Sequence, residues 1–412
     1  MRIKDLERNK RHLFWLCWLV YFATYLGRLG YAATLGEMIR TEGFSKAEAG
    51  FIGTVFFISY GIGQLITGFV GDKASPRTMI FLGTFISALC NFGMTMVKGS
   101  ILMSIIWCAN GVVQSFVWSP IVRLLSTHFD TQEKSRVMVF INSSGPMGTL
   151  VTYALSALFV MLFHNWRYFF WLSAILLGGI SFVWLSATGK LIKELPSYVN
   201  RREEKEKRGK RSFVKGGLIF IAAALFIQGM LKDGITTWVP TFLTEVFSLA
   251  SAVSIITTAG IPLCNLLGIY MVVWLRKRIP NELTASGVLF FYTAILCALM
   301  VAVGSLHAML SIVLFALITT FMMSINTLLV SIVPGYFAIE GRASSMSGFL
   351  NSMAYAGSAS SSYSFGAIAG GYGWNAVMLF WFILSLVGWG MTFLGKKNWA
   401  KTKEGILKKE AA

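Results

Sequence analysis

Long apolar segments alternate with short polar ones along almost the whole chain. Each apolar segment approaches or exceeds the ~20 residues that an α-helix needs to cross a bilayer. We therefore predict twelve membrane-spanning helices, and with them an all-α membrane protein. The predicted spans cover residues 12–35, 47–70, 78–97, 101–123, 136–163, 168–188, 214–243, 249–275, 284–304, 308–334, 342–369 and 374–395.

The composition agrees with this pattern. Of the 412 residues, 55% are hydrophobic and only 13% are charged, which is too few to cover a soluble protein of this size. The 40 glycines suit helices that pack closely in a membrane. The five cysteines all lie in apolar segments without metal-ligand spacing, so we expect them to be buried. No cleavable signal peptide is evident, and the first apolar segment reads as the first helix.

The positive charges sort to one side of the predicted membrane. Thirty of the 36 Lys and Arg residues fall in the termini and in alternate loops on a single side. Cytoplasmic loops carry such an excess, so we expect both termini in the cytoplasm. The net charge of +18 is then mainly a sign of topology, and nucleic-acid binding is not expected.

A long polar segment divides six spans from six spans. We predict an N-terminal half over 1–188, a basic cytoplasmic linker over 189–213, a C-terminal half over 214–395 and a cytoplasmic tail over 396–412. When the sequences of the two halves are aligned with Arg28 opposite Lys232, their polar loops also align without gaps. The halves are therefore expected to be pseudo-symmetric, although few residues are identical.

Arg28 and Lys232 are the two cations that topology does not explain. A charge at membrane depth costs ~3 kcal/mol or more on insertion scales and is usually functional. We predict that both bind one anionic substrate near the bilayer midplane. The alternative is a structural role, in which the cation pairs with backbone carbonyls or with a carboxylate. Asp233 is the acidic residue within an apolar segment and is therefore the candidate for such a pair. Neighbouring helical side chains point ~100° apart, so we expect poor pairing of Lys232 with Asp233, and Asp233 is also a candidate for proton coupling.

Other polar residues share these segments. Tyr21 and Tyr25 lie on the same helical face as Arg28 and are expected to line the substrate site. Asn142 and Ser144 form a polar break before Pro146, where they either contact substrate or join helices. The histidines are scattered and no phosphate-binding loop of ATP-driven proteins occurs, so we predict no catalytic residues, metal or cofactor.

The segment GFVGDKASPR after the second span resembles the signature loop of the major facilitator superfamily. The resemblance implies the major facilitator fold and alternating access between its halves. It also implies gating or conformational roles for residues in and around this loop. These are Gly68, Asp72, Lys73, Arg77 and Arg123.

Finer features resemble the organophosphate:phosphate antiporter family of glycerol-3-phosphate and hexose-phosphate carriers. They are the segments YFATYLGRLGYA and GITTWVPTFLTEV, together with Gln114, Trp118, Pro120 and Arg123. The resemblance implies that phosphate binds between two basic residues. In this sequence Arg28 and Lys232 occupy these two positions. Lys232 replaces the expected arginine, whose planar fork would hold two phosphate oxygens.

Three further positions depart from the family pattern. Gln64 replaces a lysine of the second helix, Ser144 a histidine of the glycerol-3-phosphate carrier, and Gly229 a tyrosine of the seventh helix. Gln64 and Ser144 are nevertheless expected to contact the substrate. The departures imply that the anion site is kept and that the rest of the pocket differs.

These features predict a secondary transporter in the bacterial inner membrane that exchanges a phosphorylated metabolite for inorganic phosphate. One alternative is a proton-coupled carboxylate symporter, which the adjacent Lys232 and Asp233 keep open. The other is a membrane sensor with a transporter fold. The expected partners are a small anionic substrate and membrane lipid, and we expect a monomer.

Overall fold

The computed structural model describes residues 6–70, 74–129, 133, 137, 140–141, 143–196, 217–337 and 343–410. These residues are almost entirely helical and include no β-strand. A spanning helix satisfies all of its backbone hydrogen bonds within one segment, which is what the bilayer interior demands. The all-α fold predicted from the hydropathy pattern is confirmed.

Six long helices form the described part of the N-terminal half. They are α1 (Arg8–Glu42), α2 (Lys46–Val70), α3 (Pro76–Met96), α4 (Ser100–His128), α6 (Ser144–Phe163) and α7 (Arg167–Glu194). Pro76 at the first turn of α3 needs no hydrogen-bond donor there, and Gly43 ends α1 in the left-handed conformation at φ 72°.

The C-terminal half repeats this pattern with interruptions. Its elements are α9 (Leu218–Phe247), α10 (Ser251–Thr258), α11 (Ile261–Arg278), α12 (Glu282–Val303), α13 (Ala308–Asn326), the π-helix η2 (Thr327–Ile332), α14 (Val333–Tyr336), α15 (Ala343–Tyr372) and α16 (Trp374–Glu410). The eighth predicted span is thus broken into α10 and α11, where Pro262 follows directly on the first residue of α11. The tenth changes to a π-helix before it ends.

Eleven helices of the described residues are long and apolar enough to cross a membrane by length and composition. The serine-rich α15, with 30 residues, completes the twelve predicted segments. Several ends differ from the prediction. The last helix continues through the predicted tail to Glu410, and α7 continues to Glu194, inside the predicted linker. The predicted domain boundaries otherwise stay a prediction, since most of the linker lies outside the described residues.

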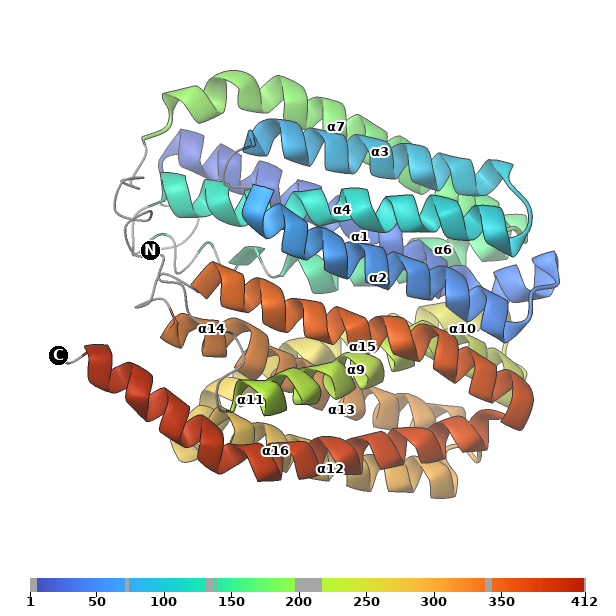
Figure 1. Cartoon of the computed structure of the whole chain (residues 1–412). Helices are drawn as coiled ribbons and strands as arrows, with labels where there is room; N and C mark the ends of the chain where they lie inside the picture. The colour runs from blue at the N-terminus through green and yellow to red at the C-terminus, as the bar shows by residue number, and fades with distance from the viewer. Residues whose placement is uncertain are drawn as a thin grey trace.

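The two halves lie side by side, one above the other in Figure 1. The start of α1 and the end of α16 lie at the left, which we call the near end; the end of α1 and the start of α2 lie at the right, which we call the far end (Figure 1). Across the boundary α2 packs on α15, and α6 packs on α10 and α11. The second segment of each half therefore meets the fifth segment of the other, as the predicted pseudo-symmetry requires.

Small residues allow the closest helix contacts in the C-terminal half. A Cβ atom at Gly229 would lie 1.9 Å from the carbonyl oxygen of Ala354, and one at Gly357 would lie 1.9 Å from that of Phe226. Close approach of this kind is a main source of helix association in lipid. Because α9 and α15 touch backbone to backbone here, no tyrosine can replace Gly229 in this packing.

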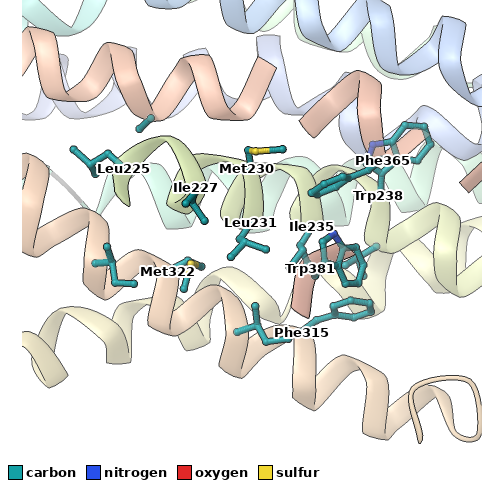
Figure 2. Packing of buried hydrophobic residues seen from close by; sticks show 14 of the residues in the cluster. Leu225, Ile227, Met230, Leu231, Ile235, Trp238, Phe315, Met322, Phe365 and Trp381 are labelled. Carbon is teal, nitrogen blue, oxygen red and sulfur yellow. The ribbon is translucent and has the colours of Figure 1, made fainter. Parts of the chain in front are cut away.

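The opposite side of α9 is apolar. Leu231, Ile235 and Trp238 are fully buried among residues of α13, α15 and α16 (Figure 2). Phe315 and Trp381 are among them, with ring centroids 5.7 Å apart. This packing fixes α9 against its own half and so determines which side of α9 faces the N-terminal half.

Candidate functional site

Arg28 lies beside two tyrosines of its own helix. Its guanidinium carbon is 3.9 Å from the ring centroid of Tyr25 and 5.9 Å from that of Tyr21. The two rings meet edge to face, with centroids 5.5 Å apart. Cations are attracted to aromatic faces at these distances. The structure thus brings together the three residues that helical periodicity placed on one stripe of α1.

Two tyrosines from other helices complete the surroundings of Arg28. Tyr60 on α2 has its ring centroid 5.7 Å from the guanidinium carbon. Tyr355 on α15 lies within electrostatic range of Arg28, and its ring centroid is 4.7 Å from that of Tyr60. We call Tyr21, Tyr25, Tyr60 and Tyr355 the tyrosine cluster. It contains residues of both halves.

Gln64 belongs to this arrangement through Tyr60. Its amide nitrogen donates a hydrogen bond of 3.0 Å to the Tyr60 hydroxyl, and its side chain is buried. Sequence reasoning placed Gln64 at the site and missed Tyr60. The signal was available, because Tyr60 precedes Gln64 by four residues and so shares its helical face.

A buried amide network holds α1 next to Arg28. The carbonyl oxygen of Gly27 accepts hydrogen bonds from Asn91 at 3.0 Å and Asn110 at 2.9 Å. Ser87 donates to Asn110 at 2.7 Å, and Gln114 donates to Ser87 at 3.0 Å. The network joins α1 to α3 and α4 and fixes the rotation of α1. It therefore determines the direction in which Arg28 points.

Lys232 forms an ion pair with its neighbour, contrary to the sequence-based expectation. The ammonium nitrogen is 3.2 Å from a carboxylate oxygen of Asp233, and both side chains are about a quarter exposed. The expectation considered the divergence of the two Cα–Cβ bonds. It neglected the four-carbon stem of lysine, which is long enough to return the ammonium to the next residue.

Asp233 also connects α9 to α15. Its second oxygen accepts a hydrogen bond of 2.6 Å from the Ser358 hydroxyl. Tyr355, one turn before Ser358, is within electrostatic range of both Asp233 and Arg28. The Tyr355 side chain is therefore close enough to interact with both charged positions that the sequence singled out.

Arg28 differs from Lys232 in its partners. Among the residues that the structure describes, no carboxylate forms an ion pair with Arg28. It keeps part of its accessible surface and is surrounded by aromatic rings. A guanidinium of this kind can take two oxygens of an anion as a planar fork. Lys232 keeps further ammonium donors for an anion, but Asp233 already compensates its charge.

Ser144 and Asn142 are placed differently from Arg28. Ser144 is fully buried, and its hydroxyl donates to the carbonyl of Ile141 at 2.5 Å, so in this conformation it is not open to a ligand. Asn142 lies outside the described residues. The glycines that follow leave room for the Tyr25 side chain, because a Cβ atom at Gly145 or Gly148 would lie 2.7 Å from it.

Three of the predicted gating residues are described, and they lie toward the near end. Gly68 is in the last turn of α2, whereas Asp72 and Lys73 lie outside the described residues. The Arg77 guanidinium donates to the carbonyl of Leu185, and the Arg77 backbone carbonyl accepts from the Trp184 indole at 3.0 Å, which joins α3 to α7. Arg123 donates to the carbonyl of Ala74 at 3.0 Å, which ties α4 to the loop before α3.

Polar contacts between the halves concentrate toward the far end. Lys46 and Glu245 form an ion pair of 2.7 Å, and Glu245 also accepts from the Trp374 indole at 2.8 Å. Ser251 donates to Glu37 at 3.1 Å. Within the described residues, the hydrogen bonds and ion pairs that join the halves lie level with Tyr60 or nearer the far end. The far end is therefore closed.

A pocket of about 360 Å³ also lies at the far end, within the N-terminal half and away from Arg28. Its lining consists of Thr41, Glu42, Lys98, His164, Asn165 and Arg167. Arg167 there is already paired with Glu42 at 2.5 Å. The pocket thus has a structural ion pair in its wall and takes no part in the site around Arg28.

Known proteins resemble the chain along most of its length. Residues 17–362 match the family model of the Major Facilitator Superfamily. A glycerol-3-phosphate transporter of Bacillus subtilis is 26% identical over 72% of this chain and 71% of its own. A probable hexose phosphate transport protein of Chlamydia pneumoniae is 22% identical over 68% of each.

Solved structures share the fold at lower identity. A bacterial homologue of the human lysosomal transporter Spinster, in an inward-facing and occupied conformation, superposes with a TM-score of 0.78. The two chains are 12% identical, and the match covers 96% of this chain and 99% of the other. At this identity the similarity concerns the fold alone.

Proposed function

The chain belongs to the major facilitator superfamily of transporters, and we propose that it exchanges a small phosphorylated metabolite for inorganic phosphate. The observation that supports this proposal most directly is the environment of Arg28. It lies deep in the membrane-spanning region, within a cluster of tyrosines from both halves and without an ion-pair partner among the described residues. A cation within the membrane-spanning region that no protein carboxylate neutralises is suited to a ligand anion.

The similar transporters support phosphate as the anionic group. The relative of Bacillus subtilis is a glycerol-3-phosphate transporter, and that of Chlamydia pneumoniae is a probable hexose phosphate transport protein. Both relatives are matched over about two thirds of their length or more. Phosphate offers several oxygens to a guanidinium fork on one side and an ammonium on the other.

We place the near end in the cytoplasm of a bacterial inner membrane. The basic ends of α11 and α16 support this orientation under the positive-inside rule. With the far end closed, the structure then corresponds to a conformation that is closed toward the outside of the cell. Alternation would require separation of Lys46 from Glu245 and of Ser251 from Glu37.

Anion binding would couple these conformations. In the empty carrier Asp233 compensates the charge of Lys232, and Arg28 is the uncompensated cation of the site. An anion held by both Arg28 and Lys232 balances this charge and draws the two halves together. A carrier that changes conformation mainly when it is loaded exchanges one anion for another.

Counterflow in proteoliposomes tests the proposal. We expect labelled glycerol 3-phosphate or glucose 6-phosphate to enter vesicles loaded with inorganic phosphate, and not vesicles loaded with chloride alone. Uptake driven by a pH gradient in the absence of internal phosphate would contradict exchange.

The Lys232–Asp233 pair favours a second candidate, a proton-coupled carrier of a carboxylate. In this candidate Asp233 carries the transported proton, and its neutralisation frees Lys232 to bind the carboxylate together with Arg28. This candidate predicts that sugar acids, and not phosphate esters, compete for the site and that uptake follows a pH gradient.

A further inference from the structure

Asp233 is a carboxylate at the position where the proposed anion would bind. It shares α9 with Lys232, at 3.2 Å, and its other oxygen accepts from Ser358 on α15. The other titratable groups that face it are Tyr355 on α15 and Tyr153 on α6, both within electrostatic range. Arg28 on α1 is within electrostatic range of Tyr355. No other acidic side chain forms an ion pair with these cations in the described part of the chain.

The charges around the proposed anion do not match a phosphate ester. Arg28 and Lys232 are positive and Asp233 is negative, so the empty site carries one net positive charge. A phosphate monoester carries about −1.5 to −2 near neutral pH. A bound dianion would leave an excess negative charge and would lie beside the Asp233 carboxylate. Two anionic groups this close repel each other, and one proton shared between them removes the excess charge.

Asp233 has no route away from the ligand. It follows Lys232 directly in one helix, so its carboxylate stays near any anion that the ammonium holds. Its hydrogen bond to Ser358 points toward α15 and keeps it at the contact of the two helices. Neutralisation in place is the change that the geometry allows without unwinding α9.

We propose that Asp233 makes binding proton-coupled, so that each phosphate dianion binds together with one proton shared by the Asp233 carboxylate and the phosphate. The proposal rests on the function proposed above. On binding, this carboxylate–phosphate pair takes one proton from water, and Lys232 contacts a phosphate oxygen. On release the proton returns to water and the ion pair forms again. The loaded site then has two positive charges against two negative ones.

The proposal also concerns specificity. A singly charged carboxylate would balance the site with Asp233 ionised, and would therefore bind without a proton. Phosphate dianions and carboxylates thus differ in a measurable quantity, the number of protons taken up for each ligand bound.

Titration calorimetry measures this number on the intact wild-type protein. Glycerol 3-phosphate is titrated at about pH 8, where phosphate monoesters with a second pKa near ~6 are already dianions. The titration is repeated in two buffers with different enthalpies of ionisation. We expect uptake of about one proton for each ester, and a dissociation constant that rises about tenfold for each unit of pH.

Two variants test whether proton uptake on ester binding depends on the Asp233 carboxylate. Asp233→Asn keeps the shape and the hydrogen bond but cannot ionise, so the ester should bind without proton uptake and with an affinity independent of pH. Ser358→Ala is the matched control, because it removes the hydrogen bond and keeps the carboxylate; proton uptake should persist.

The outcomes separate this inference from the proposed function. Ester binding by the wild type without proton uptake would overturn the role of Asp233 and leave the proposed function intact. So would proton uptake that persists unchanged in Asp233→Asn. If the folded wild type bound neither phosphate esters nor inorganic phosphate, both proposals would be wrong.

Discussion

Tyr60 of α2 and Tyr355 of α15 touch across the boundary between the two halves, with ring centroids 4.7 Å apart. Tyr60 lies beside Arg28, and Tyr355 is within electrostatic range of both Arg28 and Asp233. The contact therefore connects the two charged parts of the candidate site. Any movement of one half against the other must change it.

The Tyr355 hydroxyl should matter more for binding than for stability. Tyr355→Phe keeps the ring contact with Tyr60 and removes a hydroxyl that is within electrostatic range of Arg28 and Asp233. We expect a loss of about 0.5–1.5 kcal/mol in phosphate-ester affinity, about threefold to tenfold, with little change in melting temperature. Calorimetry and thermal unfolding measure the two effects. Tyr363→Phe, at an exposed position, is the control and should change neither.

The position of α1 should depend on the amide network at Gly27. Asn110→Ala removes one hydrogen bond to the Gly27 carbonyl and leaves Ser87 without its acceptor. We expect a destabilisation of about 1–3 kcal/mol and weaker ester binding, although Asn110 itself does not contact Arg28. Thermal unfolding and ligand affinity are measured together. Unchanged affinity in a destabilised variant would show that the network does not orient Arg28.

Gly229 should tolerate no side chain. In Gly229→Ala the new Cβ atom would meet the carbonyl of Ala354, so α9 and α15 must separate. Overpacking of this kind costs about 1–3 kcal/mol, which should lower the melting temperature in detergent. Gly179→Ala is the matched control, because a Cβ atom there has no neighbour within 4 Å. Equal melting temperatures for the two variants would contradict the close contact of α9 with α15.

The Lys46–Glu245 pair should hold the far end closed. Glu245→Gln weakens its 2.7 Å ion pair, whose side chains are 19% and 34% exposed. Such pairs contribute about 1 kcal/mol or less, so the population open at the far end should rise by up to about fivefold. Lys98→Ala, an exposed cation at the same end, should have no effect.

Spin-label distances report this opening. Cysteines at Thr41 and Ala250, both exposed, would carry the labels on a background without Cys108 and Cys264, the two native cysteines that are not buried. A longer distance should become more populated in Glu245→Gln. An unchanged distribution would show that other contacts keep the far end closed.

The sequence predicted the helices and the depth of Arg28 because both depend on local patterns. Apolar segments of spanning length are visible one by one, and the stripe of Tyr21, Tyr25 and Arg28 follows from helical periodicity within α1. Tyr355 was missed because its place near Arg28 depends on how α15 packs, which no local pattern records. Tyr60 was missed although its spacing to Gln64 places both residues on one face of α2.

Two side-chain expectations depended on geometry that the sequence does not show. Lys232 pairs with Asp233 because the lysine stem bends back along α9. Ser144 is fully buried because its hydroxyl bonds to the backbone of Ile141. The roles predicted for Asp72, Lys73 and Asn142 stay predictions, as these residues lie outside the described part of the chain.

The central claim is that Arg28 binds the transported anion. The most direct measurement is exchange of labelled glycerol 3-phosphate against internal phosphate in proteoliposomes, with Arg28→Ala compared with Arg278→Ala at the exposed end of α11. Loss of a charged partner should cost about 2–5 kcal/mol, which is at least about thirtyfold in affinity. We predict that exchange is abolished in Arg28→Ala and retained in Arg278→Ala. Full exchange by a folded Arg28→Ala carrier would contradict the claim.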